Sequence, residues 1–506
     1  MSEFTPSVYQ QKIYDWFKTG SDCIAVSAVA GSGKTTTIVQ GLHQTPKSIH
    51  FNSTHILFAA FNKSIVEELL RRLPTGVDCR TIHSLGYATL ANGMRNIPKL
   101  NTDDTKYKVM AKRLSLDSSY GDPHVFRDAA LSLLKFAQAT LCPIDSESLA
   151  DVADRFNVEI PPCGIEPLAE TVSLFLKEGI RQTEESGKIS FGDMVWMPGF
   201  LEMQPATYGL VCVDEAQDLS KAQMTLIQRA SNGSGRVIAV GDPRQAIYQF
   251  AGAESDSFHQ IVRHFDAQQM PLSICYRCPS SVIAEAQKIV PQIECAPGSA
   301  PGIVDTITDK KFREMIASGD MVLCRTTAPL IKLCFELIGQ RKQARIKGRD
   351  VAASLVNAVK QICNRQPFES FSVLLQGYRM KQLEVLEQKI GSESQQEALN
   401  DRCDALEVCY QSFQPVTKEG FISDIESLFS DQRAAITLST VHRAKGLENA
   451  RVFILHPEKL PLIWKGQTPE QNRQEWNLKY VAITRAQREL YFVSIQEKEY
   501  EISGEG

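Results

Sequence analysis

A glycine-rich run, AVAGSGKTTT, contains the residue types and the spacing that bind phosphate groups. It occupies residues 28–37 and follows the short apolar run CIAV, so a strand, a tight turn and a helix N-terminus are expected in succession. Gly31 and Gly33 allow backbone N–H groups to converge on phosphate oxygens, and the helix dipole adds partial positive charge. Lys34 is then expected to reach the β- and γ-phosphates of a nucleotide, and the Thr35 hydroxyl to bind Mg²⁺.

One position departs from the strict pattern of such loops, which has Gly where this chain has Ala28. A glycine-rich turn without a ligand is therefore the alternative interpretation of the run. If the run binds a nucleotide, the contacting residues are Ala28, Val29, Ala30, Gly31, Ser32, Gly33, Lys34, Thr35 and Thr36.

A pair of acids at the end of an apolar run is the second chemical feature. LVCVDEAQD predicts a buried strand that delivers Asp214 and Glu215 at its C-terminal end, where α/β folds place their chemistry. Asp214 can hold Mg²⁺ through water, since this ion keeps several waters and needs only one or two protein carboxylates. Glu215 can orient and deprotonate an attacking water. A solvated acidic loop would not normally follow LVCV, so the two segments together predict a Mg²⁺–ATP site that hydrolyses ATP.

Composition sets broad limits on the class of protein. A chain of 506 residues is too long for one ordinary core, and 43% hydrophobic residues are typical of a soluble globular protein. The longest apolar runs are strand-sized, shorter than the roughly 20 residues that a bilayer requires, and the first residues show no secretory leader. A net charge of −4 argues against a basic coat for nucleic acid but allows a local basic groove.

The thirteen cysteines lie mostly inside apolar runs, which suits a reducing compartment. Cys275 and Cys278 form a Cys-x-x-Cys pair without a second pair at zinc-site spacing, so no metal is expected there.

Apolar strand-like runs alternate with helical patterns along most of the chain, which predicts an α/β fold with parallel sheets. After the strand-like run at 56–61, apolar residues recur at helical spacing and are expected in the core: Ile65, Val66, Leu69, Leu70 and Leu73. Further strands are predicted in LVCVDE, RVIAVGDP, MVLC, ITLST, RVFIL and LYFVS. We therefore expect two α/β halves, each interrupted by a helical insertion. The predicted boundaries are 1–84 with 189–270 for the first domain, 85–188 for its insertion, 271–346 with 431–506 for the second domain, and 347–430 for its short insertion.

Four later segments complete a motif series that resembles the UvrD/Rep/PcrA type of superfamily 1 DNA helicases. In order they are GDPRQAIYQFAGA, SICYRCPS, LSTVHRAKGLE and LKYVAITRA. The runs AFNKSIVEEL, TIHSLGY and ISFGDMVWMP resemble in detail the helicase core of F-box DNA helicases, although no F-box is expected in the two dozen residues before the loop. A bacterial or phage relative is an equal alternative. The resemblance implies two RecA-like domains with parallel sheets.

The resemblance also implies roles at the nucleotide. Gln10 would read the adenine edge, with Gln11 as the alternative, and Tyr276 would stack on the adenine. Gln245 would contact the γ-phosphate or the attacking water. Glu448 would hydrogen-bond the ribose.

Three further nucleotide contacts follow from the resemblance. Gly446 would approach the γ-phosphate through its backbone. Arg277 and Arg485 would act as arginine fingers, a class of group worth about 10³–10⁵ in rate in related phosphoryl transfers.

Single-stranded DNA is the implied polymer, held by base stacking and short polar contacts. The candidate residues are Phe61, Asn62, His83, Tyr248, Phe250 and His442. Stacking contributes about 1–3 kcal/mol per base and tolerates any sequence, whereas core packing is the alternative role of each aromatic residue. Relatives commonly have Trp and Arg where this chain has Phe250 and Ala251, so the guanidinium contact of that motif is not carried over.

The activity implied is inchworm translocation, in the 3′ to 5′ direction, on single-stranded and tailed duplex DNA. Only 21 residues follow Arg485, too few for a C-terminal nuclease domain (506 − 485). A translocase that displaces proteins from DNA with little unwinding remains the alternative. The expected setting is a monomer without membrane contact, with replication or recombination proteins as partners. We expect it in the cytoplasm of a bacterial or phage-infected cell, or in the nucleus of a eukaryote.

Overall fold

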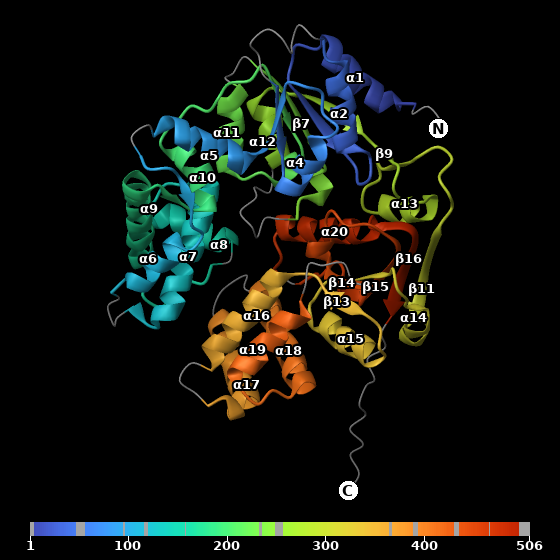
Figure 1. Cartoon of the computed structure of the whole chain (residues 1–506). Coiled ribbons are helices and arrows are strands. Elements are labelled where there is room, and N and C mark those ends of the chain that lie inside the picture. The colour runs from blue at the N-terminus through green and yellow to red at the C-terminus, as the bar shows by residue number, and fades with distance from the viewer. Residues whose placement is uncertain are drawn as a thin grey trace. The chain divides into compact units, whose positions relative to one another are not determined.

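Short apolar segments form the central strands of two parallel sheets, one in each half of the chain (Figure 1). The computed structural model divides the chain into unit 1, Met1–Ser273, and unit 2, Ile274–Gly506. The residues that it describes are 5–46, 56–94, 97–115, 120–156, 158–231, 235–247, 257–363, 367–387, 393–429, 435–464 and 466–494.

The sheet of unit 1 has six strands in the order β3-β2-β6-β7-β1-β8, and every neighbouring pair is parallel. The strands are β1 (Ile24–Ala28), β2 (Ile56–Ala60), β3 (Val77–Thr81), β6 (Leu210–Val213), β7 (Arg236–Gly241) and β8 (Gln268–Leu272). The predicted α/β class is confirmed. Because all strands are parallel, their carboxyl ends share one edge of the sheet, and the residues that follow them can meet there.

Alternate residues of the central strands β1, β2, β6 and β7 enter two different cores. Ile56 and Phe58 of β2 belong to one apolar cluster, whereas Leu57 and Ala59 belong to another. The first face is covered by α1 (Val8–Thr19), α2 (Lys34–Gln44) and α4 (Lys63–Leu69). The second face is covered by α5 (Ile82–Gly93), α10 (Phe191–Phe200), α11 (Lys221–Ser231) and α12 (Ser257–His264). Burial on both faces explains why the central strands β1, β2, β6 and β7 are largely apolar.

One predicted core residue of unit 1 is exposed. Leu69 is fully buried, but α4 ends there, and the side chain of Leu70 is 60% exposed. The helical spacing predicted Leu70 in the core because it assumed that the helix continued. That prediction is wrong.

Between β3 and β6 the chain forms the predominantly helical segment that its sequence predicts. After α5 it comprises β4 (Asn101–Thr102), α6 (Lys106–Arg113), α7 (Pro123–Thr140), α8 (Ser146–Phe156), α9 (Glu166–Ser186) and β5 (Lys188–Ile189). The strands β4 and β5 pair in parallel where the segment leaves and rejoins the rest of unit 1. Neither was predicted, because two residues are too few to show a strand periodicity.

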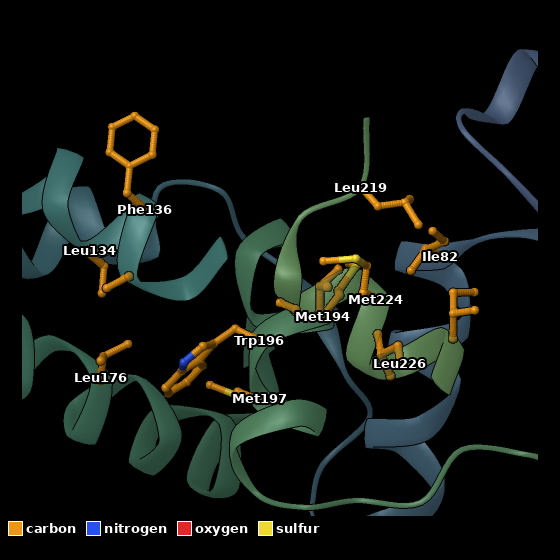
Figure 2. Close-up of a cluster of buried hydrophobic side chains, with 14 of the residues drawn as sticks. Ile82, Leu134, Phe136, Leu176, Met194, Trp196, Met197, Leu219, Met224 and Leu226 are labelled. Atoms are coloured by element: carbon orange, nitrogen blue, oxygen red, sulfur yellow. The ribbon is translucent and has the colours of Figure 1, made fainter. Parts of the chain in front are cut away.

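The helix α10 shares its side chains between this segment and the helices that cover the sheet. Figure 2 shows Met194 on the side of Ile82 and Leu226, whereas Trp196 lies on the side of Leu134 and Leu176. All six residues belong to one continuous buried cluster. The helices α6–α9 therefore share one continuous core with the rest of unit 1.

The sheet of unit 2 also has six parallel strands, in the order β11-β16-β15-β12-β14-β13. They are β11 (Ile303–Thr308), β12 (Met321–Cys324), β13 (Ala344–Ile346), β14 (Ile436–Thr440), β15 (Asn449–Leu455) and β16 (Ala486–Ser494). Four of them contain the predicted runs MVLC, ITLST, RVFIL and LYFVS. A separate short ribbon pairs β9 (Ile274–Cys275) with β10 (Glu294–Cys295).

Helices surround this second sheet and extend from it. They are α13 (Ser280–Gln287), α14 (Asp309–Met315), α15 (Ala328–Gly339), α16 (Arg349–Ile362), α17 (Phe371–Glu387), α18 (Glu393–Phe413), α19 (Lys418–Leu428) and α20 (Pro469–Ile483). One apolar cluster joins Val322 and Leu438 of the sheet to Phe371 of α17 and Phe421 of α19. Within the described part of the chain, no helix is long and apolar enough to cross a bilayer.

Candidate functional site

The glycine-rich loop connects β1 to α2 at the carboxyl edge of the first sheet. Gly31 and Gly33 have φ angles of 67° and 77°, a left-handed conformation that favours glycine. Gly33 is the N-cap of α2 and offers no side-chain cap, so the first backbone N–H groups of the helix are directed toward a ligand position. Ala28 ends β1 as an ordinary strand residue, which explains why this position does not require glycine.

The loop leaves space and an unused hydroxyl where phosphate oxygens would bind. A Cβ added at Gly33 would meet only the Nε2 atom of Gln10, at 3.9 Å. Ser32 is fully buried, and its Oγ atom has no hydrogen-bond partner among the described residues. A buried polar atom without a partner is costly, and a phosphate oxygen would satisfy it. The loop therefore fits a nucleotide phosphate, which supports the nucleotide interpretation over an empty turn.

Four of the predicted residues meet in one cluster. The Thr35 hydroxyl donates to Oδ2 of Asp214 at 2.6 Å, and Lys34 Nζ donates to Oε2 of Glu215 at 2.9 Å. Asp214 and Glu215 directly follow β6, and β7 separates β6 from β1 in the sheet. The shared carboxyl edge of the parallel strands thus brings together residues that are far apart in sequence.

The cluster contains more acidic than basic groups. Burial, and then the neighbouring charge of Glu215, raise the pKa of Asp214 to about 6. Burial opposes the charge of Lys34, but its carboxylate neighbours outweigh that effect and raise its pKa. Burial also raises the pKa of Asp242. Asp214 and the Thr35 hydroxyl that contacts it are oxygen ligands that Mg²⁺ would fit, because this ion keeps several waters and needs only one or two protein carboxylates.

Two further residues, which sequence reasoning did not single out, connect the acidic pair to the next strand end. Gln217 donates to Oε2 of Glu215 at 2.7 Å and accepts from the backbone N–H of Asp242 at 2.9 Å. Asp242 in turn accepts from the amide of Gln245 at 2.8 Å. The one sequence feature that reflects this contact is Gly241, which precedes Asp242. A Cβ at this position would lie 2.5 Å from the Oε1 atom of Gln217, so a larger residue would displace the glutamine.

The backbone of Glu215 is itself unusual. Its φ angle is 52°, in the left-handed region that non-glycine residues seldom adopt. Strain of this kind is found where the surrounding structure holds a functional side chain in place. Here Lys34 and Gln217 hold the carboxylate.

The structure distinguishes between the two glutamines proposed for adenine. Gln10 is 2% exposed, and its Nε2 atom donates to the hydroxyl of Thr37 in the first turn of α2 at 3.2 Å. Gln11 instead donates to the side chain of Asp15 at 2.9 Å, within α1. Gln10 is thus the glutamine beside the loop.

Three further residues of the glycine-rich loop have buried side chains. Ala28, Val29 and Ala30 are at most 3% exposed. The hydroxyl of Thr36 accepts a hydrogen bond from Nη2 of Arg72 at 3.0 Å.

The DNA candidates of unit 1 lie at the ends of two neighbouring strands. Phe61 follows β2 with 42% of its surface exposed, and Asn62 caps α4 by accepting from the N–H of Ile65 at 2.9 Å. His83 lies in the first turn of α5, directly after β3. Burial lowers the pKa of His83. The ring of Phe191, at the start of α10, lies 5.6 Å from that of His83 and is 52% exposed.

Sequence reasoning did not single out Phe191, although its segment ISFGDMVWMP was part of the resemblance. The other candidates of unit 1, Tyr248 and Phe250, and the neighbouring Ala251 lie outside the described residues.

In unit 2, Arg277 and Glu448, both predicted to contact the nucleotide, contact each other. Tyr276 is 45% exposed. Arg277 donates from Nε to Oε2 of Glu448 at 2.5 Å, and Gln487 donates to the other oxygen of that carboxylate at 2.9 Å. Gly446 has a φ angle of 83°, and a Cβ there would meet nothing within 4 Å.

Arg485 and His442 are more enclosed than the other candidates of unit 2. Arg485 is 1% exposed and donates to the carbonyls of Val481 at 2.8 Å and Leu447 at 3.0 Å. His442 is half-buried, and burial, followed by the charge of Arg325, lowers its pKa to about 3. The imidazole ring is therefore neutral at ordinary pH.

The Cys-x-x-Cys pair lies in the same part of unit 2. Both cysteines are buried, and Cys278 contacts the carbonyl of Thr484 at 3.6 Å. Among the described residues, no group of three or more His, Cys, Asp or Glu side chains is arranged to hold a metal ion.

Comparison with known proteins finds two family models along the chain. Residues 10–266 match the UvrD/REP helicase N-terminal domain, and residues 409–497 match the UvrD-like helicase C-terminal domain. F-box DNA helicase 1 of Gallus gallus is 23% identical over 549 residues, which cover 100% of this chain and 50% of that protein. The chain thus spans about half the length of that relative.

Two bacterial proteins are similarly distant. A probable DNA helicase II homolog of Mycoplasma pneumoniae is 24% identical and covers 94% of this chain and 82% of its own length. The ATP-dependent DNA helicase PcrA of Staphylococcus epidermidis is 24% identical over 54% of this chain and 38% of that protein.

Proposed function

Because the chain belongs to the UvrD/Rep helicase family, we propose that it is an ATP-driven motor that moves along single-stranded DNA and unwinds duplex DNA. The observation that carries the proposal is the cluster in which Lys34 and Thr35 of the loop bind Glu215 and Asp214 of the next motif. A loop that cradles phosphates, beside acids that can hold Mg²⁺ and activate water, has the parts needed to transfer a phosphoryl group to water.

Each residue of the cluster has one proposed task. Lys34 binds the β- and γ-phosphates of ATP, and Thr35 and Asp214 would hold Mg²⁺, which neutralises charge on the phosphate oxygens. Glu215 accepts a proton from the attacking water, and Gln217 keeps that carboxylate oriented. Gln245 contacts the γ-phosphate or the water, and Gln10 reads the adenine.

The residues of unit 2 enter the proposal through the family resemblance. Tyr276 would stack on adenine, Gly446 would approach the γ-phosphate, and Glu448 would bind the ribose. Arg277 and Arg485 would stabilise charge in the transition state. In the structure each guanidinium group already has partners within its own unit. We therefore propose that each exchanges a protein acceptor for phosphate oxygen during the cycle.

DNA binding is proposed for the aromatic side chains that follow β2 and β3 and for Phe191 at the start of α10. Phe61 and Phe191 are 42% and 52% exposed, whereas large aromatic residues are usually buried, and the ring of His83 lies beside that of Phe191. A base that stacks on such a ring contributes about 1–3 kcal/mol whatever its identity, as a protein that moves along a strand requires. The neutral His442 would add a hydrogen bond rather than a charge.

We extend the proposal to direction and setting on the basis of the family alone. Movement is proposed from 3′ to 5′ by a monomer that acts in replication, repair or recombination. The protein would work in the bacterial or phage-infected cytoplasm or in a eukaryotic nucleus.

Duplexes with a single-stranded tail on either the 3′ or the 5′ side test the direction. With ATP and a trap strand, the protein is expected to unwind the duplex with the 3′ tail, and Lys34→Ala, which cannot hold the phosphates, is the inactive control. Unwinding only from the 5′ tail would reverse the direction. Displacement of streptavidin from biotinylated single strands without unwinding would favour the second candidate, a translocase that clears proteins from DNA.

A further inference from the structure

A fully buried charged pair lies at the base of the helical segment of unit 1, away from the nucleotide loop. Lys106 Nζ and Asp193 Oδ2 are 2.8 Å apart, and both side chains have no exposed surface. The other oxygen of Asp193 accepts from the hydroxyl of Tyr107 at 2.6 Å and from the amide of Gln138 at 3.2 Å. Replacing such a pair with apolar residues is often neutral or stabilising, so the pair contributes little to the free energy of folding. Its candidate role is instead to fix the positions of the side chains and helices that it connects.

The other hydrogen bonds of Lys106 are made with residues of the same helical segment. Besides Asp193, three acceptors share the N–H groups of Lys106 Nζ: the carbonyl of Gly179 at 2.7 Å, the hydroxyl of Thr183 at 3.0 Å and the carbonyl of Lys188 at 3.0 Å. Through one ammonium group and one carboxylate, the helices α6, α7 and α9 and the strand β5 all meet the start of α10.

Two glycines allow the side chains of Tyr107 and Gln138 to come close enough to bind Asp193. A Cβ at Gly179 would lie 2.3 Å from the hydroxyl of Tyr107, and a Cβ at Gly192 would lie 2.3 Å from Oε1 of Gln138. The helices α9 and α10 therefore have glycine at the positions where the side chains of Tyr107 and Gln138 pass to reach Asp193.

Asp193 also determines the conformation of the first turn of α10. Its carboxylate accepts from the N–H of Ser190 at 2.9 Å, and its own N–H donates to the Ser190 hydroxyl at 3.1 Å, which forms a capping box. Between these two residues lies Phe191, whose N–H donates to Asp104 at 3.2 Å. The turn is thus held by residues of the helical segment and presents the exposed ring of Phe191 beside His83.

We propose that Lys106, Tyr107 and Gln138 are positioning residues for DNA binding, which act through Asp193 to hold Phe191 against His83. The inference rests on the proposed binding of single-stranded DNA. It assigns to the helical segment a task beyond its own packing, because a base can stack fully only on a ring whose orientation is fixed before the strand arrives.

Tyr107→Phe is the test variant, because it removes one hydrogen bond to Asp193 and little volume. Tyr208→Phe is the matched control. The hydroxyl of Tyr208 donates to Asp78 at 2.7 Å, and the residue is 5% exposed, compared with 7% for Tyr107. Both variants lose a bond between tyrosine and a carboxylate in unit 1, and the melting temperature of each is expected to fall.

The measurement is the dissociation constant for fluorescein-labelled oligo(dT), together with the DNA concentration that gives half-maximal ATP hydrolysis. Tyr107→Phe is expected to raise both by roughly three- to tenfold, part of the contribution of one stacked base, while the maximal rate at saturating DNA is retained. Tyr208→Phe is expected to leave both at the wild-type values. Equal affinities in the two variants would overturn the inference.

A double-mutant cycle separates positioning through Phe191 from a general loss of folding. If Tyr107 acts through this ring, Phe191→Ala alone and Phe191→Ala with Tyr107→Phe bind DNA equally weakly. Additive losses would show that Tyr107 acts elsewhere and would refute the proposal. If the unsubstituted protein does not bind oligo(dT), the proposed function itself fails, and the inference fails with it.

Discussion

At the scale of single residues, the two glutamines of α1 offer a sharp test of how the base of the nucleotide is recognised. Gln10→Ala is expected to raise the KM for ATP and to reduce the preference for ATP over GTP, because its amide lies beside the loop. Gln11→Ala is the control, since that side chain bonds Asp15 instead. Steady-state hydrolysis with each nucleotide measures the preference. If Gln11→Ala is the variant that loses it, adenine recognition has been assigned to the wrong residue.

His442 makes a prediction about pH. Its pKa falls from 6.5 to about 3 on folding, through burial and then the charge of Arg325. The unfolded chain takes up a proton near pH 6.5 that the folded unit 2 does not bind. The contribution to stability is therefore complete above pH 6.5 and is lost as the pH falls toward 3, by at most about 1.4 kcal/mol per pH unit.

Urea denaturation at several pH values between 7 and 4 tests this prediction. His442→Gln is expected to show a shallower loss of stability on acidification than the wild type, because glutamine takes up no proton. Identical pH profiles would contradict the low pKa. The same neutrality predicts that the variant keeps the wild-type salt dependence of DNA binding, which reports the number of cations at the phosphates.

The cluster of Lys34, Thr35, Asp214 and Glu215 could be predicted because these residues lie in short contiguous motifs. Lys34 and Thr35 are adjacent, as are Asp214 and Glu215, and each pair follows an apolar strand whose end is predictable. Gln217 could not be predicted in the same way, because its partners, Glu215 and the backbone of Asp242, are set by the packing of β6 beside β7. Phe191 was missed for the same reason, since its contact with His83 depends on how α10 crosses α5.

At the scale of elements, that crossing of α5 and α10 depends on a glycine. A Cβ at Gly86 would lie 1.8 Å from the carbonyl oxygen of Met194, a backbone atom that has little freedom to move. Gly86→Ala is therefore expected to lower the free energy of unfolding by about 1–3 kcal/mol or more, as overpacking does, despite the better helix propensity of alanine.

The control for this variant is Gly377, inside α17, where a Cβ would meet nothing within 4 Å. Gly377→Ala is expected to stabilise the protein by about 0.5–1 kcal/mol, through helix propensity alone. Scanning calorimetry of the two variants gives the sign of each effect. A stabilising Gly86→Ala would show that the two helices are not in close contact.

The elements that could be predicted were those with a strong local pattern. Central strands such as β6 and β12 are apolar on both faces, and the runs LVCV and MVLC form these strands with the bounds that they suggest. The ribbons β4–β5 and β9–β10 were not foreseen, because each strand has two residues and is defined only by its partner. Leu70 was misplaced because the end of α4 is set by the following turn and not by apolar spacing.

At the scale of the whole molecule, each unit combines one parallel sheet with a helical segment that shares its core. The order of motifs along the chain predicted this organisation, because each sheet motif follows a recognisable strand. What no local pattern could indicate is that the helical segment of unit 1 reaches the exposed ring of Phe191 through the buried carboxylate of Asp193.

ATP hydrolysis in response to single-stranded DNA is the activity that most directly defines the proposed motor. The direct measurement is the steady-state rate of ATP hydrolysis by the purified chain, with and without oligo(dT), for the wild type and for Glu215→Gln. DNA is expected to stimulate the wild type, and Glu215→Gln, which cannot accept the proton of the attacking water, is expected to be slower by at least about a hundredfold. A wild-type rate that does not respond to DNA, or a Glu215→Gln variant as fast as the wild type, would contradict the account.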